Sequence, residues 1–453
     1  MKNIIGIIRE GISKKGERRV AVTPEYAKKI VEWGHRLIVQ PAVNPKTGEI
    51  KRAFPDVLYK HAGAEISEDL SPADVIFGLK EIHPSRILPG KAYYFFSHTH
   101  KGQLKNRHML KALVENKVTL VDYELITNEN NNRLITAFGF NAGYAGMVDS
   151  LWTLGKRLKS KGIHNPFELI SQSVEEEHLY KAKENFAHVA HKIESKGTPK
   201  KLPPVIVCFL GRGKTAKGAR EMFDILPHEE ITIDQLEDVY NNGSRNKLYV
   251  LHISRDVIYR LKKSAVKFKD EYEKLTPRDK RNFYNQNPEL FESNLDNVLP
   301  YITVLMNCII WSPKYPRTVT IKMMEEIYSE HKTLQVIGDI TCDPNGSIEF
   351  SKETWIDNPV YIYDPLTKKI KEGFDGTGIA VMAVTNLPCE FSADASMQFS
   401  EDLSPFLKSI ITADYKGQFN NSGLEPEIEK AVILWNGKFT ERFSYMINFL
   451  GDV

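Results

Sequence analysis

Short apolar runs alternate with helical patterns through the first 135 residues of the chain. Runs with the length of strands occur at IIGIIRE, RLIVQ, DVIFGLKE, AYYFFSH and VTLVDYE, and amphipathic patterns occur between them at YAKKIVEWGH and LKALVENK. Strands that alternate with helices at such short spacings form parallel sheets. The pattern therefore predicts a parallel sheet flanked by helices.

A second set of strand-like runs follows a Lys- and Pro-rich stretch at 195–204, which predicts an exposed loop. The first run, PVIVCFL, leads into a glycine-rich turn and a helical pattern, and later runs are KLYVLHIS, VLMNCIIW, TLQVIGDIT and VYIYD. A charged segment near 260–299 predicts surface helices and loops inserted into this sheet. Residues 143–161 predict a long amphipathic helix, and the chain beyond Leu387 reads as mostly helical, with N-caps at Ser392 and Ser404.

Length and charge narrow the class of protein. The 453 residues suffice for two or three domains. Because 61 basic and 58 acidic side chains leave a net charge of only +3, we expect no nucleic-acid partner. The sequence has no long apolar run and no basic leader at its start, so we expect neither a membrane span nor a secretion signal.

The cysteines predict a reducing compartment and no metal site. Their positions are too far apart for zinc-ligand spacing: Cys208, Cys308, Cys342 and Cys389. We therefore expect free thiols, a cytoplasmic protein and no metal.

The glycine-rich turn has the spacing of a dinucleotide-binding motif. Gly211, Gly213 and Ala216 match G-x-G-x-x-G/A directly after a strand-like run and at the start of a helical pattern. The glycines allow a tight turn and close approach of a pyrophosphate to the helix N-terminus. Asp234, about 20 positions further on, is the candidate acceptor for a ribose 2′-OH. It could equally cap a helix that begins there.

Polar residues end three of the strand-like runs in the first region. Lys80 and His98 each follow an apolar run, and Asp122 and Glu124 end a third. Because ligands bind outside the carboxyl ends of parallel strands, these residues are candidates for acid–base work. They could also be ordinary polar strand ends.

The loop after the first run is rich in charge. It contains Glu17, Arg18 and Arg19, with Arg9 and Glu10 just before it. A planar guanidinium binds a carboxylate bidentately, so an arginine here is a candidate clamp for an acid substrate. A solvated charged loop is the alternative.

Several strings together carry a family resemblance. They are REGISKKGERRVAVTP, GLKE, FFSHTHKGQ, LVDYE, AFGFNAGYAGM, GRGKTAKGA, NCIIW, GDITCDPNGSIEF and GTGIAVMAVTNLP, and they extend over nearly the whole chain. In this order they resemble the alanine dehydrogenase and saccharopine dehydrogenase superfamily. Within it, the chain is most similar to the lysine-ketoglutarate reductases.

The resemblance implies a reaction and its cofactor. Lysine would condense with 2-oxoglutarate, and a reduced nicotinamide would convert the imine to saccharopine. Lys80 and His98 match the acid–base lysine and histidine of the family, although which of them is the acid stays open. NADPH is the expected cofactor. NADH is the alternative, because Asp234 would repel the 2′-phosphate of NADPH. Arg212, Arg245 and Lys247 are the basic residues that could bind that phosphate instead.

Further residues are carried over from the resemblance. Arg19 matches a carboxylate-binding arginine, with Arg18 and Glu17 beside it. Glu124 matches a carboxylate that either supports the residues in contact with the substrate or binds the substrate amine itself. The cofactor-binding set is Gly211, Arg212, Gly213, Ala216, Asp234, Asp343 and Asn386, of which Asp343 and Asn386 would lie near the nicotinamide and its ribose.

The resemblance also implies the domain layout. We expect two Rossmann-like α/β domains: a discontinuous substrate-binding domain of residues 1–136 plus 387–453, and a dinucleotide-binding domain of 137–386, with the active site in the cleft between them. The chain ends at Val453 without a saccharopine-oxidising half, so a separate enzyme is expected to consume the product. A homo-oligomer is compatible with the sequence.

Alternative functions stay open at this stage. The fungal-type, lysine-forming saccharopine dehydrogenase with NAD shares the same signatures. An alanine dehydrogenase is disfavoured by the length of the chain and by FFSHTHK and GSIEF. A catalytically silent nucleotide-binding module is the alternative from a different class.

Overall fold

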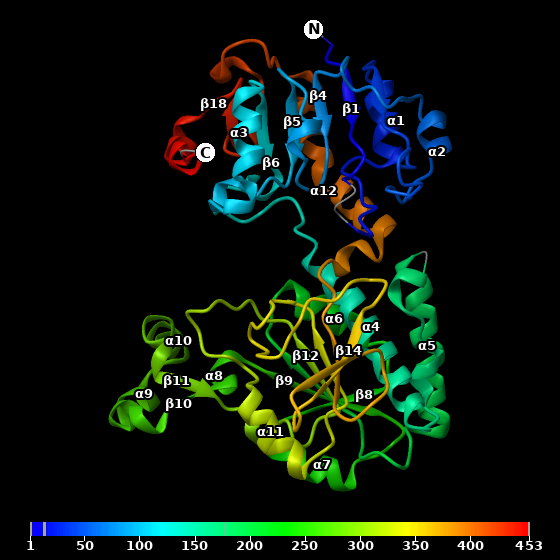
Figure 1. Ribbon diagram of the computed structural model, residues 1–453, viewed down its shortest axis with the longest axis vertical. Helices are drawn as coiled ribbons and strands as arrows, with labels where there is room; N and C mark the ends of the chain where they lie inside the picture. Colours follow the sequence, from blue (N-terminus) through cyan, green and yellow to red (C-terminus); the bar gives the residue numbers. More distant parts are fainter. Residues whose placement is uncertain (1, 12–14, 177, 452–453) are drawn as a thin grey trace. The chain divides into compact units, whose positions relative to one another are not determined.

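The computed structural model describes residues 2–11, 15–176 and 178–451, and the chain divides into two compact units. Unit 1 consists of residues 1–137 and 392–453, and unit 2 of residues 138–391. The sequence predicted boundaries after residues 136 and 386. Each unit is built on its own sheet with helices around it (Figure 1).

Eight strands form one sheet in the described part of unit 1, in the order β18-β17-β6-β5-β4-β1-β2-β3. Their bounds are β1 (Ile5–Ile7), β2 (Leu37–Val39), β3 (Glu65–Ile66), β4 (Val75–Phe77), β5 (Ala92–Phe95), β6 (Thr119–Asp122), β17 (Val432–Trp435) and β18 (Lys438–Phe439). Neighbouring strands from β3 to β6 are parallel, whereas β17 and β18 add to the sheet antiparallel. The carboxyl ends of β1, β4, β5 and β6 therefore lie at the same edge.

The helices of unit 1 are α1 (Pro24–Glu32), α2 (Asp56–His61), α3 (Arg107–Glu115), α12 (Ser392–Thr412) and α13 (Pro426–Glu429). α12 belongs to the C-terminal segment and is bonded to the loop before α1. The Ser396 hydroxyl accepts from the Val20 N–H at 2.9 Å, and the Ser400 hydroxyl accepts from the Thr23 N–H at 3.0 Å. These bonds hold the two parts of the discontinuous unit together.

Eight strands also form one sheet in the described part of unit 2, in the order β15-β14-β16-β13-β12-β7-β9-β8. Their bounds are β7 (Ile206–Leu210), β8 (His228–Ile231), β9 (Leu248–Ile253), β12 (Val304–Asn307), β13 (Val336–Asp339), β14 (Val360–Asp364), β15 (Lys369–Glu372) and β16 (Ile379–Met382). The six strands β8, β9, β7, β12, β13 and β16, in the order of the sheet, are parallel to one another. β14 pairs antiparallel with β16, and β15 pairs antiparallel with β14. The central strands β7, β12 and β13 are buried and apolar up to the polar residues that end β12 and β13, as expected for a sheet covered on both faces.

The helices packed on this sheet are α4 (Gly139–Ser160), α5 (Leu179–Lys196), α6 (Lys214–Phe223), α7 (Leu236–Asn242) and α11 (Ile321–Glu330). α4 and α6 approach closely at two glycines. A Cβ atom on Gly143 would lie 2.2 Å from the Thr215 carbonyl oxygen, and one on Gly218 would lie 2.3 Å from the Phe140 carbonyl oxygen. Only glycine permits this close crossing, which fixes α6 and the turn at its N-terminus.

A mostly helical insertion separates β9 from β12. It contains α8 (Arg255–Ile258), α9 (Lys269–Lys274) and α10 (Pro277–Gln286), together with an antiparallel pair of strands, β10 (Tyr259–Leu261) and β11 (Phe291–Ser293). Figure 1 shows these elements gathered at one side of unit 2. The sequence predicted helices and loops here but not the strand pair.

Two further expectations can be compared with the structure. The chain beyond Leu387 is less helical than predicted, since β17 and β18 return to the sheet of unit 1, and Ser404 lies inside α12 rather than at a helix start. The described cysteines are free. In the described residues no helix has the length and apolar content that a membrane span requires.

Candidate functional site

Polar side chains of unit 1 gather where four neighbouring parallel strands end. Glu10 follows β1, Lys80 follows β4, His98 follows β5, and β6 ends at Asp122, two residues before Glu124. The strands β1, β4, β5 and β6 are adjacent in the sheet. Ligands of open α/β sheets bind outside this edge, where the order of the strands reverses. β1 and β4 are the strands at that reversal.

Glu10 links the loops that follow β1 and β4. Its side chain accepts hydrogen bonds from the backbone N–H groups of Leu79 at 2.9 Å and Lys80 at 3.1 Å. Burial, together with the charge of Glu17, raises the pKa of Glu10 to about 7, against the opposing effects of these hydrogen bonds and of Arg86. This carboxyl group therefore gains and loses a proton near neutral pH.

His98 has carboxylates near both ring nitrogens. Its Nδ1 lies 2.8 Å from Glu81 Oε1, and its Nε2 lies 3.8 Å from Glu124 Oε2. The residue adopts the left-handed conformation, with φ of 52°, and its ring stacks on Phe96. Lys80 precedes Glu81 on the loop after β4 and is half-buried. The sheet edge thus brings an imidazole and the lysine loop to the same region.

Asp122 is buried and anchors the loop that carries His98. It accepts from the Ser97 hydroxyl at 2.6 Å and from the N–H groups of Ser97, His98 and Glu124 at 2.9 to 3.0 Å. Burial alone would raise its pKa, but hydrogen bonds from His100, Ser97 and the Glu124 N–H outweigh burial and lower the pKa. Asp122 therefore stays ionised and sets the position of His98.

Glu124 is surrounded by basic groups. Its Oε2 lies 2.7 Å from Lys101 Nζ and 3.6 Å from His100 Nε2, and its Oε1 accepts a hydrogen bond from Arg133. The Glu124 side chain is only 10% exposed. Glu124 also faces His98, so the same carboxylate interacts with the His98 imidazole and with the positive charges of Lys101 and Arg133.

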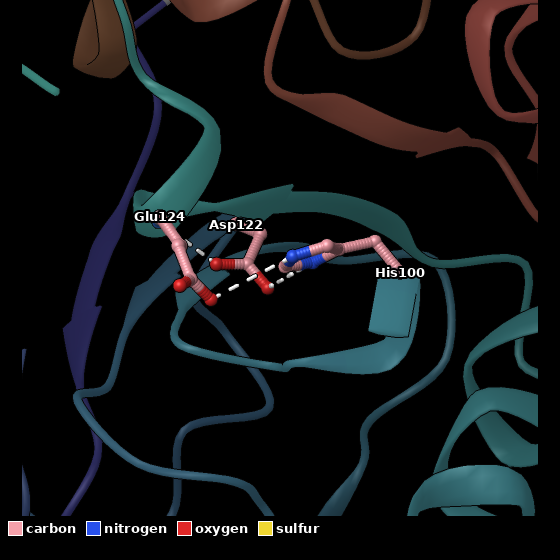
Figure 2. A group of neighbouring side chains, drawn as sticks. All are labelled: His100, Asp122 and Glu124. Carbon is pink, nitrogen blue, oxygen red and sulfur yellow. Dashed lines mark hydrogen bonds and ion pairs between the residues drawn. The ribbon is translucent and has the colours of Figure 1, made fainter. Parts of the chain in front are cut away.

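His100, Asp122 and Glu124 have possible metal-ligand atoms within 4.8 Å of one another, the only such group found among the described residues (Figure 2). Figure 2 shows the His100 ring directed at both carboxylates. The ammonium of Lys101 and the guanidinium of Arg133 already neutralise Glu124 and would repel a metal cation. The geometry therefore favours a network of hydrogen bonds and ion pairs over a metal centre.

The predicted carboxylate clamp lies in a buried ion pair. Arg19 donates from Nε at 2.8 Å and from Nη2 at 2.6 Å to the carboxylate of Glu17, and both residues are almost wholly buried. Arg18 is exposed. A substrate carboxylate at this place would meet a guanidinium that Glu17 already holds in position.

The glycine turn of unit 2 has the geometry that a dinucleotide phosphate needs. Gly211 has φ of 97° and would place a Cβ atom 3.0 Å from the Cys308 carbonyl oxygen, whereas a Cβ on Gly213 would meet nothing within 4 Å. α6 begins at Lys214 and has no side-chain cap at its N-terminus. Ala216 is buried inside α6. Free N–H groups and open space at Gly213 therefore suit a pyrophosphate.

A buried polar network ends the strands β12 and β13. Asn307 Nδ2 donates to Asp339 Oδ1 at 2.7 Å and to the Ser347 hydroxyl at 2.8 Å. Asp343 lies on the loop after β13, and burial, with the charge of Asp339, raises its pKa. Asn386 lies just before a short 3₁₀ turn that follows β16. Asp343 and Asn386 thus follow strands on one side of β7.

The surroundings of Asp234, Arg245 and Lys247 differ from those expected for residues that contact the adenosine ribose or its phosphate. Asp234 is exposed in a 3₁₀ turn beyond β8, a strand that is separated from β7 by β9. Arg245 donates to the carbonyl oxygens of Pro199 and Leu202, and Lys247 forms an ion pair with Glu229. Arg212 is exposed in the glycine turn.

The sequence matches two family models. The alanine dehydrogenase/PNT N-terminal domain matches residues 6–145, and the C-terminal domain of the same family matches residues 292–442. The chain belongs to the alanine dehydrogenase/PNT family.

Relatives of this alanine dehydrogenase/PNT family member include much longer proteins and proteins of similar length. The chain is 34% identical to alpha-aminoadipic semialdehyde synthase of Arabidopsis thaliana, over 98% of this chain and 41% of that protein. It is 30% identical to the mitochondrial protein of that name from Bos taurus, over 98% of this chain and 48% of that protein. The chain thus spans less than half of these relatives. It is 25% identical to an NAD+-dependent, L-lysine-forming saccharopine dehydrogenase of Emericella nidulans, over 88% and 90% of the two chains.

Solved structures confirm the predicted fold class for this family member. An L-alanine dehydrogenase superposes with a TM-score of 0.59 at 14% identity, covering 98% of this chain and all of that one. A transhydrogenase from Sinorhizobium meliloti superposes with a TM-score of 0.55 at 14% identity, covering 96% and 100%. The α/β architecture with two largely parallel, helix-flanked sheets is therefore that of the family.

Four residues of the candidate site in unit 1 were not singled out from the sequence. They contact His98 or Glu124: Glu81, His100, Lys101 and Arg133. Glu81 stands next to Lys80, and His100 and Lys101 follow His98, so proximity along the chain was an available signal. Arg133 gives no such signal, because only the folded loop brings it to Glu124.

Proposed function

We propose that this chain is a nicotinamide-dependent oxidoreductase that acts on the CH–NH bond of an amino acid. More narrowly, it condenses L-lysine with 2-oxoglutarate and reduces the imine to saccharopine. The observation that carries the proposal is the shared edge of the unit 1 sheet, which brings Lys80, His98 and Glu124 together in a chain with a dinucleotide turn at Gly211.

The reaction needs proton transfers at defined atoms. The neutral side-chain amine of lysine attacks the ketone carbon, a C–N bond forms, and the carbinolamine oxygen leaves as water after it gains a proton. A bound reduced nicotinamide supplies the hydride that reduces the resulting C=N bond. One base must take the proton from the amine, and one acid must give a proton to the leaving oxygen.

Lys80 and His98 are the groups we assign to these two transfers. Lys80 is half-buried, and His98 has carboxylates near both of its ring nitrogens. Asp122 fixes the backbone of His98, so the imidazole keeps its position through the reaction. Which residue is the acid stays open.

The charges around these residues suit amino acid substrates. Arg19 and Arg18, with Glu17 holding the Arg19 guanidinium, would receive carboxylate groups of the substrates. Glu124, whose carboxylate faces His98 at the strand edge, would accept a hydrogen bond from the neutral substrate amine. In unit 2 the cofactor would be held at Gly211, Arg212, Gly213 and Ala216, with Asp343 and Asn386 toward the nicotinamide.

A substrate panel tests this proposal. Purified protein is assayed with amino acids and 2-oxo acids in pairs, each with NADH and with NADPH. We expect lysine with 2-oxoglutarate to give the fastest oxidation of the nicotinamide, and mass spectrometry to detect saccharopine. Turnover of pyruvate and ammonia without activity toward lysine would replace the proposal by an alanine dehydrogenase.

The preferred direction of the reaction distinguishes the proposed saccharopine-forming enzyme from a second candidate, a lysine-forming saccharopine dehydrogenase. The resemblance to the saccharopine dehydrogenase of Emericella nidulans favours a lysine-forming reaction with NAD+ as the alternative. Initial rates in both directions distinguish the two. Faster saccharopine cleavage with NAD+ than reductive condensation with either reduced cofactor would support the lysine-forming enzyme.

A further inference from the structure

The strand that lies beside the glycine turn of unit 2 is not the next strand along the chain. β7, which leads into Gly211, pairs with β9, and β8 pairs with β9 at the edge of the sheet. In the register of β7 and β9, Leu210 lies opposite Ile253. The residues that follow these two, Gly211 and Ser254, therefore leave the sheet side by side.

A side chain holds the two strand ends together. The His252 imidazole contacts the carbonyl oxygen of Gly211 through Nε2. His252 is the residue before Ile253, at the end of β9. The start of the glycine turn and the end of β9 are thus one connected piece of structure.

This strand order decides which residues can reach the ribose of a bound dinucleotide. Its pyrophosphate would lie at the glycine turn, and Asp343 and Asn386 follow strands on the β12 side of β7. If the nicotinamide lies on the β12 side of β7, the adenosine ribose at the other end of the dinucleotide lies on the β9 side, over the end of β9. Neighbouring strands are about 4.8 Å apart, so β8, and with it the turn that carries Asp234, starts roughly 10 Å from β7.

The first two residues after β9 carry a hydroxyl group and a guanidinium, and Asp256 follows them in the sequence. Ser254 follows the strand directly, and Arg255 comes next. Arg255 is exposed, and its Nη1 donates to Asn285 Oδ1 at 3.2 Å. Its guanidinium lies 5.5 Å from the centre of the Tyr284 ring.

The insertion gives Arg255 a rigid base. Tyr284 is only 4% exposed and stacks between Tyr259, at 5.2 Å, and Tyr315, at 5.4 Å between ring centres. Among the carboxylates whose side chains the structure describes, none forms an ion pair with Arg255, although Asp256 follows it in the sequence. Arg260, on β10, instead pairs with Glu292 and Asp296. The Arg255 guanidinium is thus a candidate for binding an anion beside the glycine turn.

We infer that Ser254 and Arg255 bind the 2′-phosphate of NADPH, and that they, rather than Asp234, set the choice of cofactor. The inference rests on the proposed nicotinamide-dependent function. A guanidinium binds a phosphate through two charge-assisted hydrogen bonds, whereas the 2′-hydroxyl of NADH offers it no charge. The serine hydroxyl adds a donor to the same phosphate.

Binding of two small nucleotides to the full chain tests this inference without turnover. Isothermal titration calorimetry compares 2′,5′-ADP, which carries the distinguishing phosphate, with 5′-ADP, which lacks it. We expect the wild-type protein to bind 2′,5′-ADP at least tenfold more tightly. Arg255→Gln should weaken 2′,5′-ADP at least tenfold and change 5′-ADP less than twofold.

Asp234→Asn is the matched control, since it alters one charged group at the other candidate position. We expect the ratio of the two dissociation constants to change less than twofold. An unchanged ratio in Arg255→Gln, or a tenfold gain for 2′,5′-ADP in Asp234→Asn, would overturn the inference while leaving nucleotide binding intact. If the wild type bound neither nucleotide, the proposed function would fail as well.

Discussion

Proton transfer in the proposed reaction depends on two residues whose surroundings differ. Lys80 follows β4 beside Glu81, and His98 follows β5 between Glu81 and Glu124. Neither role follows from the strand-end position alone, because many strands end in polar residues. What distinguishes His98 is its pair of carboxylate neighbours and the backbone bond to Asp122.

We expect Lys80→Met and His98→Gln each to lower kcat by about 100-fold or more, because each removes a group that moves a proton in the reaction. Initial rates with saturating lysine, 2-oxoglutarate and NADPH measure the effect. Lys105→Met and His108→Gln are matched controls, since both residues are exposed nearby. Near-normal rates in both test variants would show that neither residue moves a proton in the reaction.

Glu10 predicts a dependence of stability on pH. Its pKa is raised from 4.5 to about 7 in the folded protein, so the folded state binds its proton more tightly than the unfolded state. Its contribution is fully present below pH 4.5 and is lost as the pH rises through 7. At 1.36 kcal/mol per pKa unit, the loss is about 3 kcal/mol.

Urea unfolding of the wild type and Glu10→Gln at pH 5, 6, 7 and 8 measures this contribution. The difference in unfolding free energy between the two proteins should fall across this range by up to about 3 kcal/mol. Glu25→Gln is the control, because Glu25 is a solvent-exposed carboxylate. Parallel pH profiles for the wild type and Glu10→Gln would show that Glu10 titrates normally.

At the scale of elements, the crossing of α4 and α6 positions the nucleotide turn. A Cβ on Gly218 would lie 2.3 Å from the Phe140 carbonyl oxygen, which is part of the backbone and yields little. Because α6 starts directly after Gly213, any movement of this helix displaces the turn. The contact between Gly218 and Phe140 therefore affects both the packing of α4 on α6 and the binding of a nucleotide at the glycine turn.

Gly218→Ala should lower the free energy of unfolding by about 1–3 kcal/mol, as expected for overpacking. It should also weaken 5′-ADP several-fold, since the α6 N-terminus must shift. Thermal unfolding and calorimetry measure the two effects, with Lys217→Ala, at an exposed position of the same helix, as the control. Unaltered stability and binding would contradict this prediction, because they would mean that α4 and α6 can move apart to accommodate the added methyl group without loss of free energy.

Sequence patterns predicted most elements because each strand and helix carries its own periodicity. The strands that precede Lys80, His98 and Glu124 were visible as apolar runs, and their shared edge followed from parallel pairing. The place of β17 beside β6 was not visible, because pairing between distant segments leaves no local pattern. The same reason explains Arg133, whose contact with Glu124 depends on a loop.

At the scale of the whole molecule, the order of strands was the information that the sequence lacked. Spacing along the chain pointed to Asp234, since it assumes that the second strand of the motif lies beside the first. In the structure β9 occupies that place and β8 lies at the edge. The spacing of residues along the chain therefore identified the glycine turn, but it did not identify the residues that lie beside the turn in the fold.

The discontinuity of unit 1 has a consequence for how the protein is made. β6 lacks its partner β17 until residues 432–435 leave the ribosome, more than 300 residues later. At synthesis rates of about 5–20 residues per second, this wait lasts roughly 15–60 s. During that time β6 is an unprotected sheet edge, the kind of surface to which other chains add. Unit 2 is continuous in the chain and can complete its own sheet within that interval. Newly made chains are therefore exposed to aggregation through the unpaired edge of β6, and unit 1 is the part of this chain that a chaperone would protect during synthesis.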